Sequence, residues 1–198
     1  MIRPITPGES ITYMSQMTGL DAERDTILSI SCFVTDAQLH SLDVDGWEVT
    51  IHHEKSALDK MNDWCISTHG KSGLTAAAIA STTTAQEATE GLLEYIKFLV
   101  PEKGKALLAG NSVHCDKEFL KEPPYNIVLD HLHYRILDVS SIKEAARRWA
   151  PERVLDMVPK KKGLHQARED ILESIEEARF YRDMIFRSAH AFKGACPV

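Results

Sequence analysis

In the first part of the chain, apolar residues interspersed with polar ones form three short runs that are typical of strands. Ile11–Thr18 ends before a glycine, where the backbone can turn sharply, and Asp25–Thr35 alternates apolar with small polar residues. Trp47–His53 is a third run of the same kind. Because no helical pattern separates these runs, they predict a meander of three antiparallel strands.

Two longer segments then show helical periodicity. Thr84–Val100 places its apolar residues along one helical face, and Pro101 stops the pattern. Near the end of the chain, a long amphipathic helix is predicted from about Leu164 to Phe186.

Between these segments, two short apolar strands each lead into a helix. Ala106–Ala109 precedes a helix that runs through Leu120, and Arg135–Val139 precedes a helix that extends from Ser140, as its N-cap, to Trp149. Three meander strands followed by strand–helix alternation predict an α/β domain. We expect a mixed five-stranded sheet flanked by helices, which is the ribonuclease H-like arrangement.

Composition agrees with one globular domain. The 198 residues are 43% hydrophobic and 26% charged, and we expect residues 11–187 to fold between an N-terminal extension (1–10) and a C-terminal tail (188–198). A formal net charge of −6 argues against a protein that coats or slides along long duplex nucleic acid. It leaves open a short oligonucleotide held by a few local contacts.

Cysteine usage and the N-terminal residues limit the cellular compartments that this chain is expected to occupy. Cys32, Cys65, Cys115 and Cys196 form no CxxC pair, which argues against a zinc site and a disulfide framework. No apolar run is long enough to cross a membrane. Residues 1–10 resemble neither a secretory signal nor an Arg-rich transit peptide, although a processed leader stays open. We expect an intracellular protein, cytoplasmic or mitochondrial.

Five stretches have patterns too specific for framework alone. They are Met17–Asp21 (MTGLD), Asp63–Leu74 (DWCISTHGKSGL), Gly110–Phe119 (GNSVHCDKEF), Tyr134–Trp149 (YRILDVSSIKEAARRW) and His165–Ile171 (HQAREDI). In this order they resemble the oligoribonucleases, dimeric 3′→5′ exoribonucleases of the DEDDh group, from about residue 11 to residue 186. The resemblance implies a ribonuclease H-like exonuclease fold, short oligoribonucleotides as ligands, a homodimer, and Mg²⁺ or Mn²⁺ as cofactor.

The chemistry implied by the resemblance needs two divalent ions held by carboxylates, with a histidine as general base. The family pattern has Asp-x-Glu on the first strand, an Asp in the GNS segment and His-x4-Asp on the last helix. Asp116 and Asp170 match two of the metal-binding acids, and His165 matches the base. Met14 and Gln16 occupy the positions of the other two acids.

These two substitutions argue against metal binding in this chain. Residues two apart on a strand share a face, so Met14 and Gln16 point where the two acids should point. A thioether is a poor ligand for Mg²⁺, and glutamine keeps the shape of glutamate without its charge. Neither Thr12 nor Asp21 is placed to replace them. We interpret Met14 as a packing residue.

The nucleotide-holding side matches the family better. The resemblance assigns Leu20 as a wedge between two bases and Trp64 with His69 as the lining of the 3′ nucleotide. It assigns Tyr134 as a stacking aromatic that the partner subunit contributes. It also assigns a group that caps the 5′ phosphate, namely Ser112, Arg135, Ser140 and Ser141. In the family, the aromatic and the arginine act across the subunit interface, so dimerisation would complete the site.

Several of these candidate site residues also have a purely structural interpretation. Alone, His165 would be an ordinary surface histidine, Asp116 a helix-start acid, and Trp64 a core residue. The pairs His52–His53 and His131/His133 have no third ligand at a useful spacing and are interpreted as structural.

Three functions stay open. The first, which we favour, is a binding protein for dinucleotide-sized RNA whose catalysis is lost or severely impaired. The second is an active Mg²⁺- or Mn²⁺-dependent 3′→5′ exoribonuclease that binds its metal through Asp116, Asp170 and the substrate phosphate. The third is a purely structural subunit.

Overall fold

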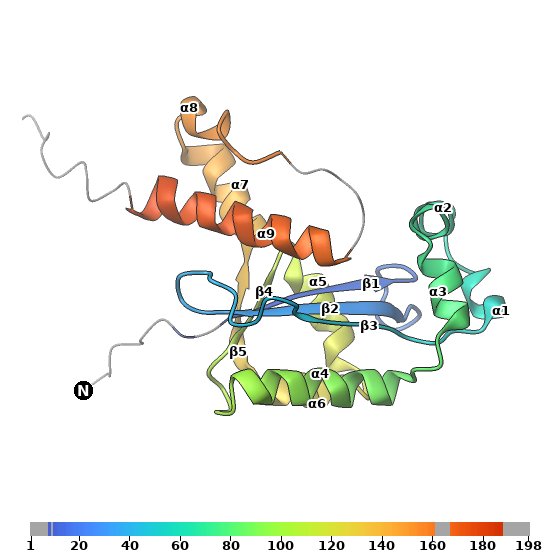
Figure 1. Ribbon diagram of the computed structural model, residues 1–198. Coiled ribbons are helices and arrows are strands. Elements are labelled where there is room, and N and C mark those ends of the chain that lie inside the picture. Colours follow the sequence, from blue (N-terminus) through green and yellow to red (C-terminus); the bar gives the residue numbers. More distant parts are fainter. Residues whose placement is uncertain (1–7, 9, 161–166, 188–198) are drawn as a thin grey trace, which may run out of the picture.

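The computed structural model describes residue 8 and residues 10–160 and 167–187 (Figure 1). The strands are β1 (Ser10–Met17), β2 (Ile27–Thr35), β3 (Trp47–Thr50), β4 (Leu107–Gly110) and β5 (His133–Asp138). The α-helices are α1 (Lys55–Leu58), α2 (Asp63–Ser72), α3 (Leu74–Ala80), α4 (Ala85–Leu99), α5 (Val113–Lys121), α6 (Asn126–His131), α7 (Val139–Trp149), α8 (Glu152–Leu155) and α9 (Ala167–Tyr181). A π-helical segment, η1 (Arg182–Arg187), continues α9.

The strands form one sheet in the order β3-β2-β1-β4-β5. β1 pairs antiparallel with β2, and β2 pairs antiparallel with β3, whereas β4 and β5 join in parallel. The mixed five-stranded sheet predicted from the sequence is therefore confirmed. The meander provides the antiparallel half, and the two strand–helix units provide the parallel half.

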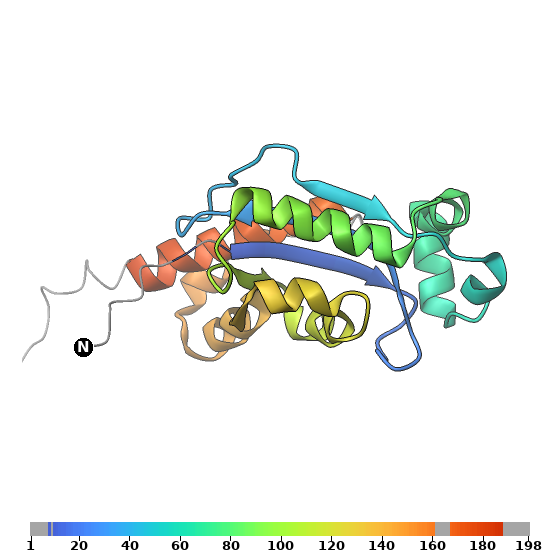
Figure 2. The ribbon, with the colours of Figure 1, turned by 90° about the horizontal axis from the view of Figure 1, so that it is seen from below.

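The alternation along β1 and β2 assigns residues to the two faces of the sheet. Ile11 and Tyr13 of β1 pack into the main core with residues of α4 and α5. Phe33 of β2 points to the other face, where it packs with Ile171 and Ile175 of α9. Figure 1 shows α9 on one side of the sheet and α4 with α6 on the other, and the sheet is thus covered on both faces (Figure 2).

Arginines of α9 and η1 hold the connection between β2 and β3. Arg168 donates to the carbonyl of Val44 at 3.3 Å, and Arg179 donates through Nε to the carbonyl of Leu39 at 3.1 Å. Arg182 donates to the carbonyl of Gln38. These contacts fasten the last helix to the first hairpin, so residues distant in sequence are brought together.

The structure differs from the sequence prediction in several elements. The sequence pattern predicted no helix over residues 55–80, where α1, α2 and α3 lie, and it also missed α6 and α8. The prediction that Ser140 is the N-cap of its helix was wrong. Asp138 is the N-cap, because its side chain accepts a hydrogen bond from the Ser140 backbone N–H at 2.9 Å.

Two further expectations concern the described residues. No helix within them combines the length and the apolar character required to span a bilayer. Cys32, Cys65 and Cys115 are free thiols, while Cys196 and His165 lie outside the described residues.

Candidate functional site

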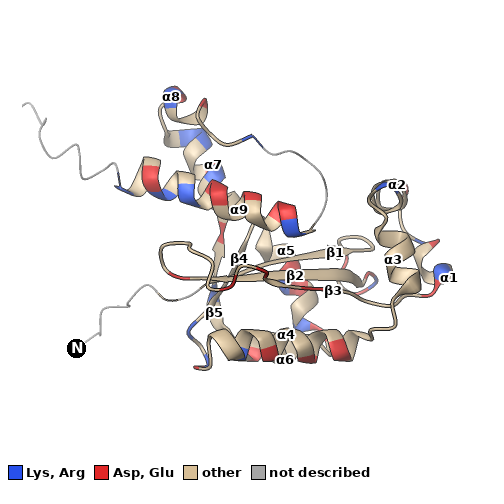
Figure 3. Ribbon diagram, in the orientation of Figure 1, with Lys and Arg blue, Asp and Glu red and all other residues tan. Residues whose placement is uncertain are grey.

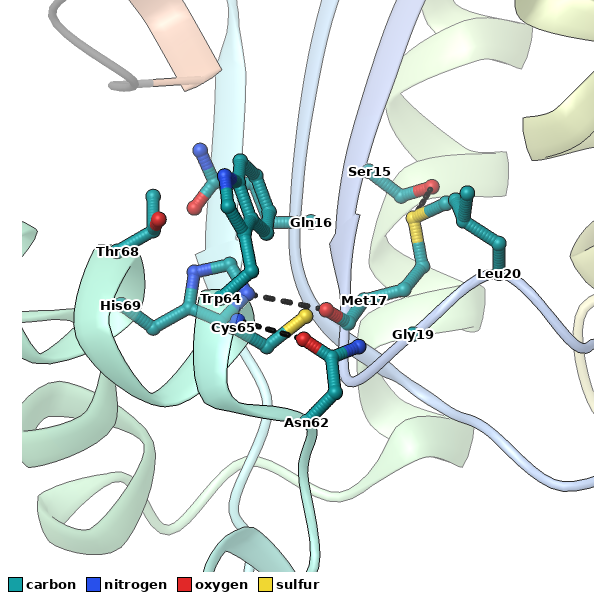
Figure 4. A pocket seen from close by; sticks show the side chains of 10 residues that line it. All are labelled: Ser15, Gln16, Met17, Gly19, Leu20, Asn62, Trp64, Cys65, Thr68 and His69. Carbon is teal, nitrogen blue, oxygen red and sulfur yellow. Dashed lines mark hydrogen bonds between the residues drawn. The ribbon is translucent and has the colours of Figure 1, made fainter.

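A pocket of about 490 Å³ opens where β1 ends, between the turn after that strand and helix α2 (Figure 4). Such a volume is within the range of small-ligand sites, roughly 300–1,000 Å³. Its lining includes four residues predicted from the sequence to belong to the site, which are Gln16, Leu20, Trp64 and His69. Segments far apart in sequence thus meet at one pocket.

The turn that carries Leu20 is organised by Asp25. The Asp25 carboxylate accepts from Thr18 Oγ1 at 2.9 Å and from the Asp21 backbone N–H at 3.0 Å. Gly19 lies directly against this carboxylate, since a Cβ there would be 2.2 Å from Asp25 Oδ2. The glycine therefore allows the close approach that lets the turn present Leu20, whose side chain is 81% exposed.

Helix α2 provides the other wall. Asn62 caps it by accepting from the Cys65 backbone N–H at 2.9 Å. Trp64 is 62% exposed and lies edge-on to the His69 ring at 6.3 Å between centroids. His69 is buried, with Nε2 3.0 Å from the carbonyl oxygen of Met17, so it joins α2 to β1. An exposed leucine and an exposed indole on opposite walls suit a flat aromatic ligand.

Asp116 of α5 is buried beside β1. Its Oδ1 accepts from the Ser15 backbone N–H at 2.9 Å and from the Ser15 hydroxyl at 2.7 Å. Burial raises the pKa of Asp116 to about 6, although the two bonds from Ser15 act in the lowering direction. The carboxylate that the resemblance assigns to a metal is therefore held by a protein donor pair.

The other positions of the implied metal site are chemically unlike the family pattern. Met14 is half-buried and packs against the cluster of Phe33, Ile171 and Ile175 beneath α9. Gln16 lies on the same face of β1 and brings no charge. Asp170, half-buried, lies in the first turn of α9.

Across the described part of the chain, no three His, Cys, Asp or Glu residues gather closely enough to hold a metal ion. His165 lies outside that part. Two carboxylates, a thioether and an amide do not match the hard anionic donor set that a pair of Mg²⁺ ions requires. The residues present in the structure therefore do not fit a two-metal centre.

Two of the residues matched to the phosphate cap, Ser112 and Ser140, meet at the junction of β4, β5 and α7. The Ser112 backbone N–H donates to Asp138 Oδ1 at 3.1 Å and to Ser140 Oγ at 3.0 Å. The Ser112 hydroxyl lies 3.1 Å from the Ser140 hydroxyl, and the Ser140 hydroxyl donates to Asn111 at 3.3 Å. Ser141 is exposed on α7. The cluster is preorganised by Asp138.

Tyr134 and Arg135 lie on the surface at the start of β5. Tyr134 is 71% exposed and stacks on His133 at 4.5 Å between ring centroids. The Arg135 guanidinium lies over the Tyr134 ring, 5.0 Å from its centroid. Neither Tyr134 nor Arg135 is among the described residues that line the pocket at β1. Within one chain the structure does not bring the base-holding group and the phosphate group together.

Sequence reasoning missed residues that position the others. Ser15, Asp25 and Asp138 bind other site residues without belonging to a matched motif position. Only Asp138 carried a local signal, because an acid between a strand and a helix is a common N-cap. The partner of Ser15 is 101 residues away, so no local pattern reveals it.

Comparisons with known proteins define the class of this protein. Residues 17–178 match a family model described as Exonuclease (RNase_T), a match that begins directly after Gln16. The sheet topology and this match define an exonuclease-type protein of the ribonuclease H-like fold.

Its relatives identify the family within that class. The chain is 47% identical to the mitochondrial oligoribonuclease of Bos taurus over 87% of its own length and 71% of that protein. It is 46% identical to the oligoribonuclease of Pseudoalteromonas translucida over 86% and 92% of the two chains. The chain belongs to the oligoribonuclease family.

A solved structure supports the fold. The zinc-bound complex of E. coli exonuclease I with single-stranded DNA superposes with a TM-score of 0.63 at 13% identity. The match covers 91% of this chain and only 42% of that one, so this chain spans less than half of exonuclease I. At such low identity the likeness concerns the fold alone.

Proposed function

We propose that this protein binds oligoribonucleotides of dinucleotide size at the pocket beside β1 and hydrolyses them slowly or not at all. Membership in a family whose curated relatives are named oligoribonucleases supports short RNA as the ligand. The observation that carries the proposal is the pair of exposed side chains, Leu20 and Trp64, that face one pocket from β1–β2 and α2. Stacking on such side chains accepts any base.

Weak hydrolysis follows from the donor set. The family's reaction relies on two divalent ions that stabilise the attacking and departing oxygens. Met14 packs with apolar side chains, Gln16 is neutral, and Asp116 is held by Ser15. Every 1.4 kcal/mol of lost transition-state stabilisation lowers the rate about tenfold. Loss of both ions would remove several such factors.

The phosphate cap and the homodimer belong to the same proposal. Ser112, Arg135, Ser140 and Ser141 would hold a 5′ phosphate, with Tyr134 stacking on a base. Tyr134 and Arg135 are exposed and do not line the pocket of their own chain among the described residues, which supports a role at the pocket of a second subunit. Such a cap limits the ligand to very short RNA and excludes long duplexes.

Charge is unevenly distributed over the helices. Acidic residues prevail on α4 and α9, whereas basic residues prevail on α7 (Figure 3). Several of these arginines are already paired, as Arg147 and Arg148 are with Glu144. The relative from Bos taurus is named a mitochondrial oligoribonuclease, and we propose the cytoplasm or mitochondria as the compartment of this protein.

Binding is tested by titration calorimetry with a 5′-phosphorylated diribonucleotide. Trp64→Ala should weaken binding about tenfold or more, because one base–aromatic stack contributes roughly 1–3 kcal/mol. Leu20→Ala should weaken binding as well, through the loss of apolar contact with a base. Phe98→Ala is the matched control, since Phe98 is 83% exposed on α4 and does not line the pocket. Absence of heat with the parent protein would remove the binding function.

Catalysis and assembly need separate measurements. Incubation of the diribonucleotide with the protein and Mn²⁺ should release almost no mononucleotide, and turnover at an ordinary enzymatic rate that Asp170→Asn abolishes would contradict the proposal. Light scattering should report a dimer. A mixture of Trp64→Ala and Tyr134→Ala subunits should recover part of the binding that each variant loses alone, because one pocket in the mixed dimer is intact.

A further inference from the structure

We infer that the pocket at the end of β1 binds its oligoribonucleotide without a divalent cation, because protein groups have replaced both the structural and the electrostatic role of the metal. The inference rests on the proposed function and deepens it. Three features of the site carry it.

The first feature is the hydrogen bonding of Asp116. A buried carboxylate that normally faces a cation needs other partners when no cation binds. Ser15 provides two of them, through its backbone N–H at 2.9 Å and its hydroxyl at 2.7 Å, both to the same oxygen. The side chain at position 15 thereby takes over the task of keeping Asp116 in place.

The second feature is the packing of Met14. Met14 extends from β1 toward α9 and adds to the cluster that contains Phe33 and Ile171. At this position a carboxylate would point into apolar side chains and would need a cation beside it to be tolerated. The thioether instead joins β1 to α9 by apolar contact, so the last helix is held against the sheet without a metal bridge.

The third feature is the charge beside the pocket. The family pattern has four acids at this site, whereas this chain has the two acids Asp116 and Asp170. Four carboxylates repel an approaching phosphate unless metal ions stand between them. Gln16 lines the pocket where one of these acids would lie. Its amide N–H₂ can donate to a phosphate or ribose oxygen, which a carboxylate cannot do.

These features predict binding that does not depend on metal. The affinity for the 5′-phosphorylated diribonucleotide, measured by calorimetry, should agree within about twofold between buffer with excess EDTA and buffer with millimolar Mg²⁺. Manganese electron paramagnetic resonance should show no bound Mn²⁺ with the parent protein. Gln16→Glu should weaken binding in EDTA about tenfold, because it adds a like charge within a few ångströms of the phosphate.

A second variant at position 16 separates the effect of charge on binding from the effect of side-chain shape. Gln16→Met has a similar volume and no charge, so it should lose only the amide hydrogen bond and bind more tightly in EDTA than Gln16→Glu. The double variant Met14→Asp/Gln16→Glu should bind the diribonucleotide well only when Mn²⁺ is present. Melting curves confirm that each variant is folded before titration.

The outcomes distinguish this inference from the function on which it rests. Binding by the parent protein only in the presence of Mg²⁺ would overturn the inference and leave the ligand assignment intact. No binding under either condition would overturn both. Equal binding by Gln16→Glu and the parent in EDTA would refute the electrostatic argument.

Discussion

Replacing Gly19 by alanine tests the turn that presents Leu20 to the ligand. The added Cβ would lie 2.2 Å from Asp25 Oδ2 and 2.6 Å from Asp25 Cγ, so the carboxylate has to move. Moving it breaks the hydrogen bonds from Thr18 Oγ1 and the Asp21 backbone N–H. Gly19→Ala should therefore rearrange the turn and displace Leu20 from the pocket.

The magnitude follows from the two bonds. A hydrogen bond to a charged group contributes roughly 1.5–3 kcal/mol when buried, and less near the surface. Because the Asp25 bonds are partly exposed, we expect a loss of about 2 kcal/mol in the free energy of unfolding. In a domain of this size that corresponds to a decrease in melting temperature of roughly 4–8 °C. Loss of the Leu20 contact should weaken diribonucleotide binding about tenfold.

The assays are thermal melting and calorimetric titration, with Gly70→Ala as control. Gly70 lies in α2 with no heavy atom within 4 Å of its ideal Cβ, so alanine there should be neutral or slightly stabilising. The reasoning is refuted if Gly19→Ala melts and binds like the parent protein, since the close contact would then be relieved at no cost.

Three further perturbations test other parts of the structure. In the absence of metal, Met14→Asp should lower the free energy of unfolding by about 2 kcal/mol, whereas Met14→Leu should lower it by less than about 1.5 kcal/mol in denaturant titrations. Burial raises the pKa of Asp116 from its ordinary value of 3.8 to about 6, so protonation favours the folded state. The contribution of Asp116 to the free energy of unfolding is full below about pH 4 and falls by up to about 3 kcal/mol as the pH rises through 6. Asp116→Asn should remove this pH dependence, as measured by melting curves at several pH values. Lys143→Met should lower the free energy of unfolding by about 3 kcal/mol, because its partner Glu177, 3.0 Å away, is 2% exposed and would be left as an unpaired buried charge. Lys121→Met, which breaks a surface pair, should shift the melting temperature by less than about one degree.

Much of the fold was predictable because local patterns match it. Apolar residues alternate with small polar ones along β2, and β1 ends at a glycine turn, so both strands were recognisable. Helix α4 begins with a capping box between Thr84 and Glu87, a strong local signal. Helix α2 was not predicted, since it buries only Cys65 and His69 and therefore shows no apolar stripe.

The site was predictable where a family motif names a residue, and not where contacts are long-range. Leu20, Trp64 and His69 were assigned from the motif segments, and the structure places them at one pocket. The role of Ser15 could not be predicted, because its contact with Asp116 exists only after β1 and α5 meet in the folded chain.

The position of α9 has a consequence for biosynthesis. This helix covers Met14 and Phe33 on the first two strands, yet it leaves the ribosome long after they do. Until then the nascent β1–β2 hairpin presents an unprotected apolar surface, which is a hazard for self-association. A stop codon ahead of residue 167 should yield insoluble, chaperone-dependent fragments rather than a smaller stable protein.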